Sequence, residues 1–231
     1  NETYPGNNSL PWTIPADVSP STSARIKVVG ENAEGISEPF TLKGISVGRP
    51  AADDVVTQGE FLSVAWDAAG LTGDVNIFYA ADGMAFDTQL NGAPINIEQG
   101  TFSWPVDTGV VEPSVTAKIR VQSIAEPDVS GESATFTLRG IVMNTPGGGE
   151  NWAHNETRTV EWFSAAAGDT LNLYYAADGT NYDSAPLNST PIVLSDGTGT
   201  FDWTIPDQTL PSDGAARIKI VTNLGIESAS Q

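Results

Sequence analysis

Cysteine is absent from this 231-residue sequence, and histidine occurs once, as His154. Without cysteine there are no disulfide bonds, so hydrophobic cores must hold the fold together by themselves. A lone histidine excludes a conventional zinc cluster and leaves no serine–histidine–aspartate set. The sequence has no Gly-x-Ser-x-Gly motif either, and acid pairs of the glycosidase kind would be unusual in a chain whose acidic residues fall in turns. We therefore expect a protein that is not an enzyme.

Basic residues are also few, with 10 lysines and arginines against 29 aspartates and glutamates, which gives a net charge of −19. An acidic excess of this size repels phosphate backbones and anionic lipids, so nucleic acid is not an expected partner. No segment approaches the roughly 20 apolar residues of a membrane span, and we expect no membrane insertion. No signal peptide opens the sequence, so we expect Asn1 to be a mature or internal start.

The sequence repeats itself at a spacing of 96 residues. Leu-Lys-Gly-Ile at 42–45 returns as Leu-Arg-Gly-Ile at 138–141, and Tyr-Ala-Ala-Asp-Gly at 79–83 returns unchanged at 175–179. Self-similarity at a fixed period of this length is typical of an array of similar structural units. The repeat is the strongest signal in the sequence.

The repeat divides the chain into three units. Residues 45–140 form a complete repeat, and residues 141–231 form a repeat that lacks its last strand. Residues 1–44 correspond to the C-terminal half of a repeat, because Trp-Thr-Ile-Pro at 12–15 returns near the end of the chain at 203–206.

Short alternating segments between turn residues predict an all-β fold. In the segment 61–66, Leu62, Val64 and Trp66 fall on one face of an extended strand. About seven such segments in each repeat are the pattern of an immunoglobulin- or fibronectin-III-like β-sandwich. We see no helical period. The fold class is therefore predicted to be all-β, with tandem sandwich domains of about 96 residues.

Tryptophans recur at fixed positions of the repeat, which predicts that they anchor the interior of each sandwich. These predicted core residues are Trp12, Trp66, Trp104, Trp162 and Trp203. Basic residues recur as pairs that flank an isoleucine, as in Lys118 and Arg120. We expect them to face solvent on an alternating strand and to protect its edge from pairing.

The third copy resembles the repeat of the Ser-Thr-rich GPI-anchored membrane family, which fungal cell-wall-synthesis proteins share with many bacterial surface proteins. The segments that carry the resemblance are Pro-Gly-Gly-Gly-Glu-Asn-Trp at 146–152, Val-Glu-Trp at 160–162, Leu-Asn-Leu-Tyr-Tyr at 171–175 and Phe-Asp-Trp-Thr-Ile-Pro at 201–206. The second copy departs from it, because 49–54 lacks the glycines and Val56 stands in place of a tryptophan. The resemblance implies immunoglobulin-like repeats of secreted proteins, with no catalytic residues.

Acidic residues offer two kinds of site. Asp82 and Asp178 open matching turns, where a structural role is favoured over metal binding because a calcium site needs six to eight oxygens. The better calcium candidate is the pair Asp53 and Asp54 at a unit boundary, since ions at such boundaries stiffen arrays. We expect no obligatory cofactor, and calcium is the candidate ion.

Aromatic residues could bind carbohydrate if they formed an exposed platform. Phe78 and Phe86, with their counterparts Tyr174 and Tyr182, are the candidates for contact with surface glycans. Packing within the fold is the alternative for the same residues. Trp152 has no counterpart in the second copy, so we expect it at a surface or a junction.

Together these features favour an extracellular, cell-surface structural protein. The repeats would form a semi-rigid spacer and assembly module in a surface layer, stalk or fibre. The expected partners are other copies of the chain or neighbouring repeats of a longer chain, and incomplete end repeats could be completed by strand addition. The alternative function is a carbohydrate-binding or adhesive module of a secreted multidomain protein.

Overall fold

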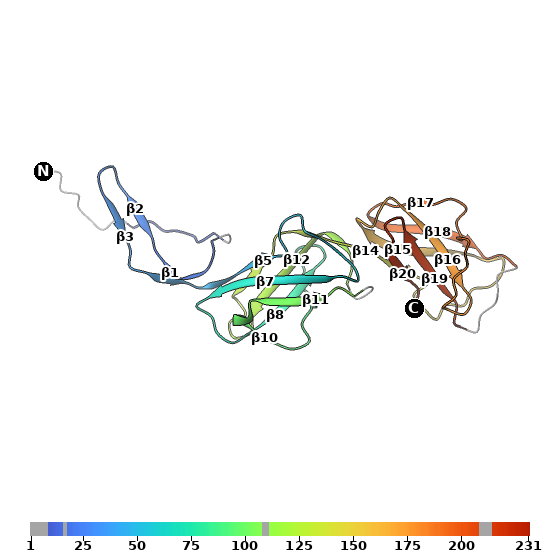
Figure 1. Cartoon of the computed structure of the whole chain (residues 1–231), viewed down its shortest axis with the longest axis horizontal. Helices are drawn as coiled ribbons and strands as arrows, with labels where there is room; N and C mark the ends of the chain where they lie inside the picture. The colour runs from blue at the N-terminus through green and yellow to red at the C-terminus, as the bar shows by residue number, and fades with distance from the viewer. Residues whose placement is uncertain (1–8, 16–17, 108–110, 208–213) are drawn as a thin grey trace.

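The computed structural model describes residues 9–15, 18–107, 111–207 and 214–231. Within these ranges the chain is all-β, apart from one 3-10 turn, η1 (Ile97–Gln99). Figure 1 shows two β-sandwiches in tandem, preceded by a separate N-terminal segment of short strands. The prediction of tandem β-sandwiches is confirmed.

The first sandwich has two layers, as the alternating segments predicted. One layer holds, in spatial order, β11 (Thr101–Pro105), β7 (Phe61–Ala69) and β5 (Gly44–Arg49). The other layer is built around β8 (Asp74–Ala80), β12 (Ser114–Ser123) and the first half of β14 (Phe136–Thr145), with the short strands β6 (Val55–Thr57), β9 (Thr88–Gln89), β10 (Ile95–Asn96) and β13 (Ser130–Glu132) beside them.

Strand β12 shows why this sequence forms a sandwich. Ala117, Ile119 and Val121 point into the core and are fully buried, whereas Lys118 and Arg120 between them are only half-buried. Alternation of this kind lets one face of the strand bury apolar area while the other stays in water. Trp66 and Trp104 complete the core, and the indole N–H of Trp66 donates to the carbonyl of Ile97 at 2.9 Å.

The second sandwich repeats this plan. One layer holds the second half of β14, then β15 (Thr157–Ala165) and β18 (Gly197–Thr204). The other holds β17 (Ile192–Val193), β16 (Thr170–Ala176), β19 (Arg217–Thr222) and β20 (Glu227–Ala229). Trp162 and Trp203 are buried in its core.

One strand belongs to both sandwiches. The first half of β14 pairs with β12 and runs parallel to β6, and residues 140–145 of the same strand pair with β15. The polypeptide therefore passes from one core to the next with no loop between them (Figure 1).

The N-terminal segment forms two short strand pairs outside both sandwiches. β1 (Ser21–Ala24) pairs with β4 (Phe40–Leu42), and β2 (Lys27–Val29) pairs with β3 (Glu34–Ile36). The pairing of Lys27 with Ile36 matches that of Arg120 with Glu132 in the complete repeat. The segment thus has the strand register of a repeat without the layers that would cover it.

The placement of Trp12 in a core was wrong. Its side chain is 51% exposed, whereas its counterparts Trp104 and Trp203 are buried. The physical reason is that the described part of the N-terminal segment supplies only the back half of a sandwich. Val28 shows the same effect, because it is 68% exposed where its counterpart Val121 is completely buried.

Candidate functional site

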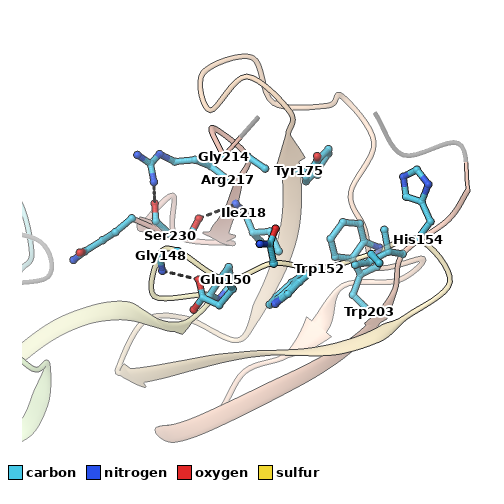
Figure 2. A pocket seen from close by; sticks show the side chains of 17 residues that line it. Gly148, Glu150, Trp152, His154, Tyr175, Trp203, Gly214, Arg217, Ile218 and Ser230 are labelled. Atoms are coloured by element: carbon cyan, nitrogen blue, oxygen red, sulfur yellow. Dashed lines mark hydrogen bonds between the residues drawn. The ribbon is translucent and has the colours of Figure 1, made fainter. Parts of the chain in front are cut away.

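A cavity of about 530 Å³ lies at an open edge of the second sandwich. Its floor is aromatic: the ring centroids of Tyr175 and Trp203 lie 5.5 Å apart, and those of Trp152 and Trp203 lie 6.4 Å apart. The walls come from the loop before β15, which carries Glu150 and Trp152, and from the start of β19 with Arg217 and Ile218 (Figure 2). The site combines an apolar floor with a strand edge.

In the first sandwich, a β-strand occupies the position that corresponds to this cavity. There, the first half of β14 lies between β12 and β6: Phe136 pairs with Ala117, and Leu138 pairs with Val56. Both apolar side chains of β14 are buried. The counterparts of Ala117 and Val56 are Ala216 and Trp152, and both line the cavity. The cavity is therefore the place that a closing strand occupies in the first sandwich, and no strand among the described residues fills it in the second.

A serine marks the point from which the closing strand starts. The backbone N–H of Ile119 donates to Oγ of Ser133 at 2.9 Å, and the N–H of Ile218 donates to Oγ of Ser230 at 3.1 Å. Figure 2 shows Ser230 at the rim of the cavity, where its carbonyl accepts a bond from Nη1 of Arg217 at 2.9 Å. The second sandwich thus has the start of the closing strand in its native position.

Glu150 shapes the other rim. Its carboxylate accepts the N–H groups of Gly147 and Gly148 at 2.6 and 2.8 Å. These bonds, the one from Gly147 first, lower the pKa of Glu150 below its usual value because they stabilise the ionised form. At the matching position Asp54 accepts the N–H of Ala51 at 2.8 Å. Both carboxylates therefore fix a tight loop just before the segment that carries Val56 in the first sandwich and Trp152 in the second.

The same hydrogen bond at Asp54 affects the calcium site that was predicted at Asp53 and Asp54. The Asp54 carboxylate serves the loop and lies 3.8 Å from Nη1 of Arg49, while Asp53 is exposed at a positive φ of 64°. Across the described ranges, no three histidine or acidic side chains are grouped as they would be around a metal ion. Among the described residues, no further acidic side chain is grouped with Asp53 and Asp54.

Asp82 and Asp178, which open the two matching turns, accept hydrogen bonds from backbone N–H groups. Oδ1 of Asp178 accepts the N–H groups of Thr180 and Asn181 at 2.9 and 2.7 Å, and Oδ1 of Asp82 does the same in the first sandwich for Met84 and Ala85. Because these bonds favour the charged form, they lower the pKa of both aspartates. The contacts are those of a structural turn.

The four aromatic candidates lie in two matching groups on the outer face of a sheet. Phe78 pairs with Arg120, whose guanidinium carbon lies 3.8 Å from the centroid of the Phe86 ring. Tyr174 likewise pairs with Lys219, whose Nζ lies 4.8 Å from the centroid of the Tyr182 ring. All four rings are half-buried. A cation already covers one face of Phe86 and of Tyr182, which reduces the ring surface left for stacking on a sugar.

The predicted outward basic residues pair across the strands. Arg120 contacts Glu132 at 2.7 Å, Lys219 contacts Glu227 at 3.2 Å, and Lys27 contacts Glu34 at 2.6 Å. A basic residue at the same repeat position pairs with a glutamate of the next strand in all three copies. Glu132 lies directly opposite its arginine, whereas Glu34 and Glu227 lie two residues earlier along their strands. Exposed pairs of this kind contribute little to stability.

Gln58 has a structural role that the sequence did not indicate. Gln58 is buried, and its Oε1 accepts the N–H of Ile141 at 3.0 Å while its Nε2 donates to the carbonyl of Val111 at 3.3 Å. It thereby fixes β14 where the strand leaves the first sandwich. Trp152, expected at a surface or a junction, is half-buried and lines the cavity at the edge of the second sandwich.

No protein-family model matches the chain, and no curated protein sequence matches it. Among solved structures, it is similar to fibronectin(III)-like modules of CbhA from Clostridium thermocellum, with 11% identity, coverage of 80% of this chain and 88% of that one, and a TM-score of 0.27. It is also similar to the I9–I11 tandem from titin, with 13% identity, coverage of 93% and 74%, and a TM-score of 0.26.

A third similar structure is SGBP-B from a complex xyloglucan utilization locus in Bacteroides uniformis, with 12% identity, coverage of 80% of this chain and 46% of that one, and a TM-score of 0.26. With identities this low, the likeness to all three concerns the sandwich fold and nothing more. Across the described residues we find no helix that is long and apolar enough to cross a membrane.

Proposed function

We propose that this chain is a non-enzymatic structural repeat region of an extracellular cell-surface protein. In a surface layer, stalk or fibre it acts as a semi-rigid spacer and assembly module. The observation that carries the proposal is the uninterrupted strand β14, which closes one sandwich and opens the next. A strand hydrogen-bonded on both sides of a junction restricts bending far more than a flexible linker does.

Contacts at the junction support the same function. The Gln58 side chain bonds the backbone of Ile141 just past the first core, so the exit of the strand is fixed by a buried polar contact. In an array of this kind, stability and shape come from each unit and its nearest neighbours. The sequence resemblance to the Ser-Thr-rich GPI-anchored membrane family repeat favours a surface location as well.

The aromatic contacts favour the spacer over a carbohydrate-binding module. Arg120 covers Phe86 and Lys219 covers Tyr182, and these cations are themselves paired with glutamates. Stacking on a sugar would require these contacts to be displaced. On a glycan array, we expect the chain to show no glycan binding that depends on Tyr182. Binding that disappears in the Tyr182→Ala variant would favour the carbohydrate-binding module.

Stiffness is measured by placing one spin label in each sandwich. The chain has no cysteine, so the exposed residues Met84 and Val193 can be replaced as Met84→Cys and Val193→Cys without background labelling. Pulsed dipolar spectroscopy should give a narrow distance distribution. A control with a Gly-Ser insert after Gly140 should broaden it, and a native distribution as broad as that of the control would refute the spacer.

A further inference from the structure

We propose that the open edge of strand β18 (Gly197–Thr204) pairs with the same edge of a second copy of this chain, antiparallel and across a two-fold axis. The inference rests on the proposed assembly function and deepens it, because it names the surface through which copies associate side by side. In a contact of this symmetry, each strand donates and accepts the same set of bonds.

The open edge belongs to the fold of the repeat. Within the described residues, β18 is the last strand of its layer and pairs only with β15. In the complete first sandwich, β11 is likewise the last strand of its layer and pairs only with β7. The free edge therefore lies inside the repeat and does not depend on where the chain begins or ends.

Alternate residues of β18 direct their backbone groups to this edge. The N–H of Ile205, the next residue, donates to the carbonyl of Glu156 at 2.9 Å, and the register of β18 on β15 is unbroken. Because successive residues of a strand bond to opposite sides, the odd-numbered positions of β18 face β15. The N–H and C=O groups of Thr198, Thr200 and Asp202 consequently face outward, and these three residues are exposed.

The first sandwich protects the corresponding edge, as β-proteins usually do. Its strand β11 ends in Pro105, which has no N–H, and Pro105 faces the open edge because the N–H of the next residue, Val106, donates to Glu60 on the side of β7. The matching residue of the second copy is Thr204. Strand β18 is eight residues long, contains no lysine, arginine or proline, and has one charged residue, Asp202. Its edge is therefore free to pair.

The sequence of β18 is complementary to itself in one antiparallel register. With Thr200 opposite Thr200 of the other copy, Thr198 lies opposite Asp202, and Gly199 lies opposite Phe201. Pairs of threonine with threonine and of threonine with aspartate can hydrogen-bond across the strands. Gly199 has no side chain, so the half-buried Phe201 ring of the other copy can cover its backbone. This self-complementarity is the reason for choosing a second copy as the occupant.

Charge favours the same register. A register centred on Asp202 would place two carboxylates directly opposite each other, which is unfavourable. With Thr200 at the centre, the two Asp202 residues are about 13 Å apart along the strands. This separation exceeds the Debye length of about 8 Å at an ionic strength of about 0.15 M.

Sedimentation velocity of the full chain over a wide concentration range, at an ionic strength of about 0.15 M, tests the contact. We expect association that Thr200→Pro weakens by about tenfold or more, because the symmetric pair loses both of its central N–H donors. The N–H of Thr200 faces outward, so the substitution removes no bond to β15. Ser103→Pro in β11 is the matched control and should leave association unchanged. A chain that stays monomeric at every concentration, or equal loss in the two proline variants, would overturn the proposal.

Two lysine variants of equal net charge test the register. Thr198→Lys places a lysine opposite Asp202 of the other copy and should strengthen association, whereas Thr200→Lys places two lysines opposite each other and should weaken it. Lysine keeps every backbone donor, so this comparison holds even if Thr200→Pro does not fold. Equal affinity of the two variants, or the reverse order, would overturn the pairing.

Hydrogen exchange resolved by residue gives an independent measurement. Raising the protein concentration should protect the amides of Thr198, Thr200 and Asp202, whereas those of Gly199 and Phe201 already face β15 and should not change. Association without this alternating protection would show that another surface is used and would overturn the proposal. Spin-label distances within a dilute monomer do not depend on this contact, so the spacer function is tested separately.

Discussion

Substitution of Gly140 by alanine should destabilise the first sandwich through a single polar side chain. Gly140 lies on β14 where the strand passes between the cores, and a Cβ added there would lie 2.0 Å from Oε1 of Gln58. The Gln58 side chain would have to move away. It would then lose its bonds to the N–H of Ile141 and to the carbonyl of Val111.

The expected loss follows from those two bonds. An unsatisfied N–H in the buried environment of Ile141 costs about 1–3 kcal/mol, and the second bond contributes about 0.5–1.5 kcal/mol. Gly140→Ala should therefore lower the free energy of unfolding of the first sandwich by about 1.5–4.5 kcal/mol. Hydrogen exchange resolved by peptide gives the loss for each sandwich separately.

The repeat supplies a matched control for this substitution. Gly44 occupies the same motif position, but a Cβ there would meet only the Cβ of Pro20 at 3.7 Å, an ordinary contact. Gly44→Ala should therefore be nearly neutral. In a Gln58→Ala background, Gly140→Ala should add little, because the obstacle is already gone. Equal effects of the two glycine substitutions, or full additivity of Gly140→Ala with Gln58→Ala, would refute the reasoning.

Three further predictions concern residues that recur in the repeat. Ser133→Ala should cost about 1–3 kcal/mol in urea unfolding, because the buried N–H of Ile119 loses its acceptor, whereas Ser37→Ala removes the same bond to Ile26 from an exposed hairpin and should cost less. Asn155 and Asn188 each open an Asn-x-Thr sequon for N-glycosylation. In a glycosylating host, mass spectrometry should find no glycan on Asn188, which is buried and whose side chain bonds Leu173 and Thr190, whereas the exposed Asn155 can be modified. A glycan on Asn188 in the folded protein would contradict this. Asp178 has a lowered pKa, so its stabilising contribution is present above the ordinary aspartate pKa and is lost as the pH falls through the lowered value. The urea midpoint of Asp178→Ala should thus fall below that of the parent near neutral pH, and the gap should narrow in strong acid; a gap independent of pH would contradict the assignment.

The sandwiches could be predicted because their evidence is periodic. Alternation in β12 and β7 fixes which side chains face inward, and the spacing of 96 residues places the same pattern twice. Trp66 and Trp162 lie in the two cores for this reason. Trp12 could not be placed this way, because burial depends on layers that are distant in the sequence.

Buried polar residues were missed because no hydrophobic pattern contains them. Asn91 accepts the N–H of Ile77 at 2.7 Å, and Asn188 accepts that of Leu173 at 2.8 Å, so each amide fixes the edge of a central strand. The signal was the recurrence of asparagine at matching places of the two copies. Gln58 gave no such signal, because its counterpart in the next copy is His154.

The copies of the repeat differ in how well they are covered, which separates features that depend on local sequence from features that depend on packing. Ile26 is 47% exposed and Ile119 is fully buried, yet the N–H of each donates to the hydroxyl of the serine at the same repeat position, Ser37 or Ser133. The hairpin register is therefore set by turn and serine chemistry, and it does not require the core. Burial of the apolar side chains requires a second layer or a closing strand. The half-repeat accordingly keeps Phe40 in an extended strand while leaving it 36% exposed, whereas its counterpart Phe136, which lies within a complete sandwich, is 1% exposed.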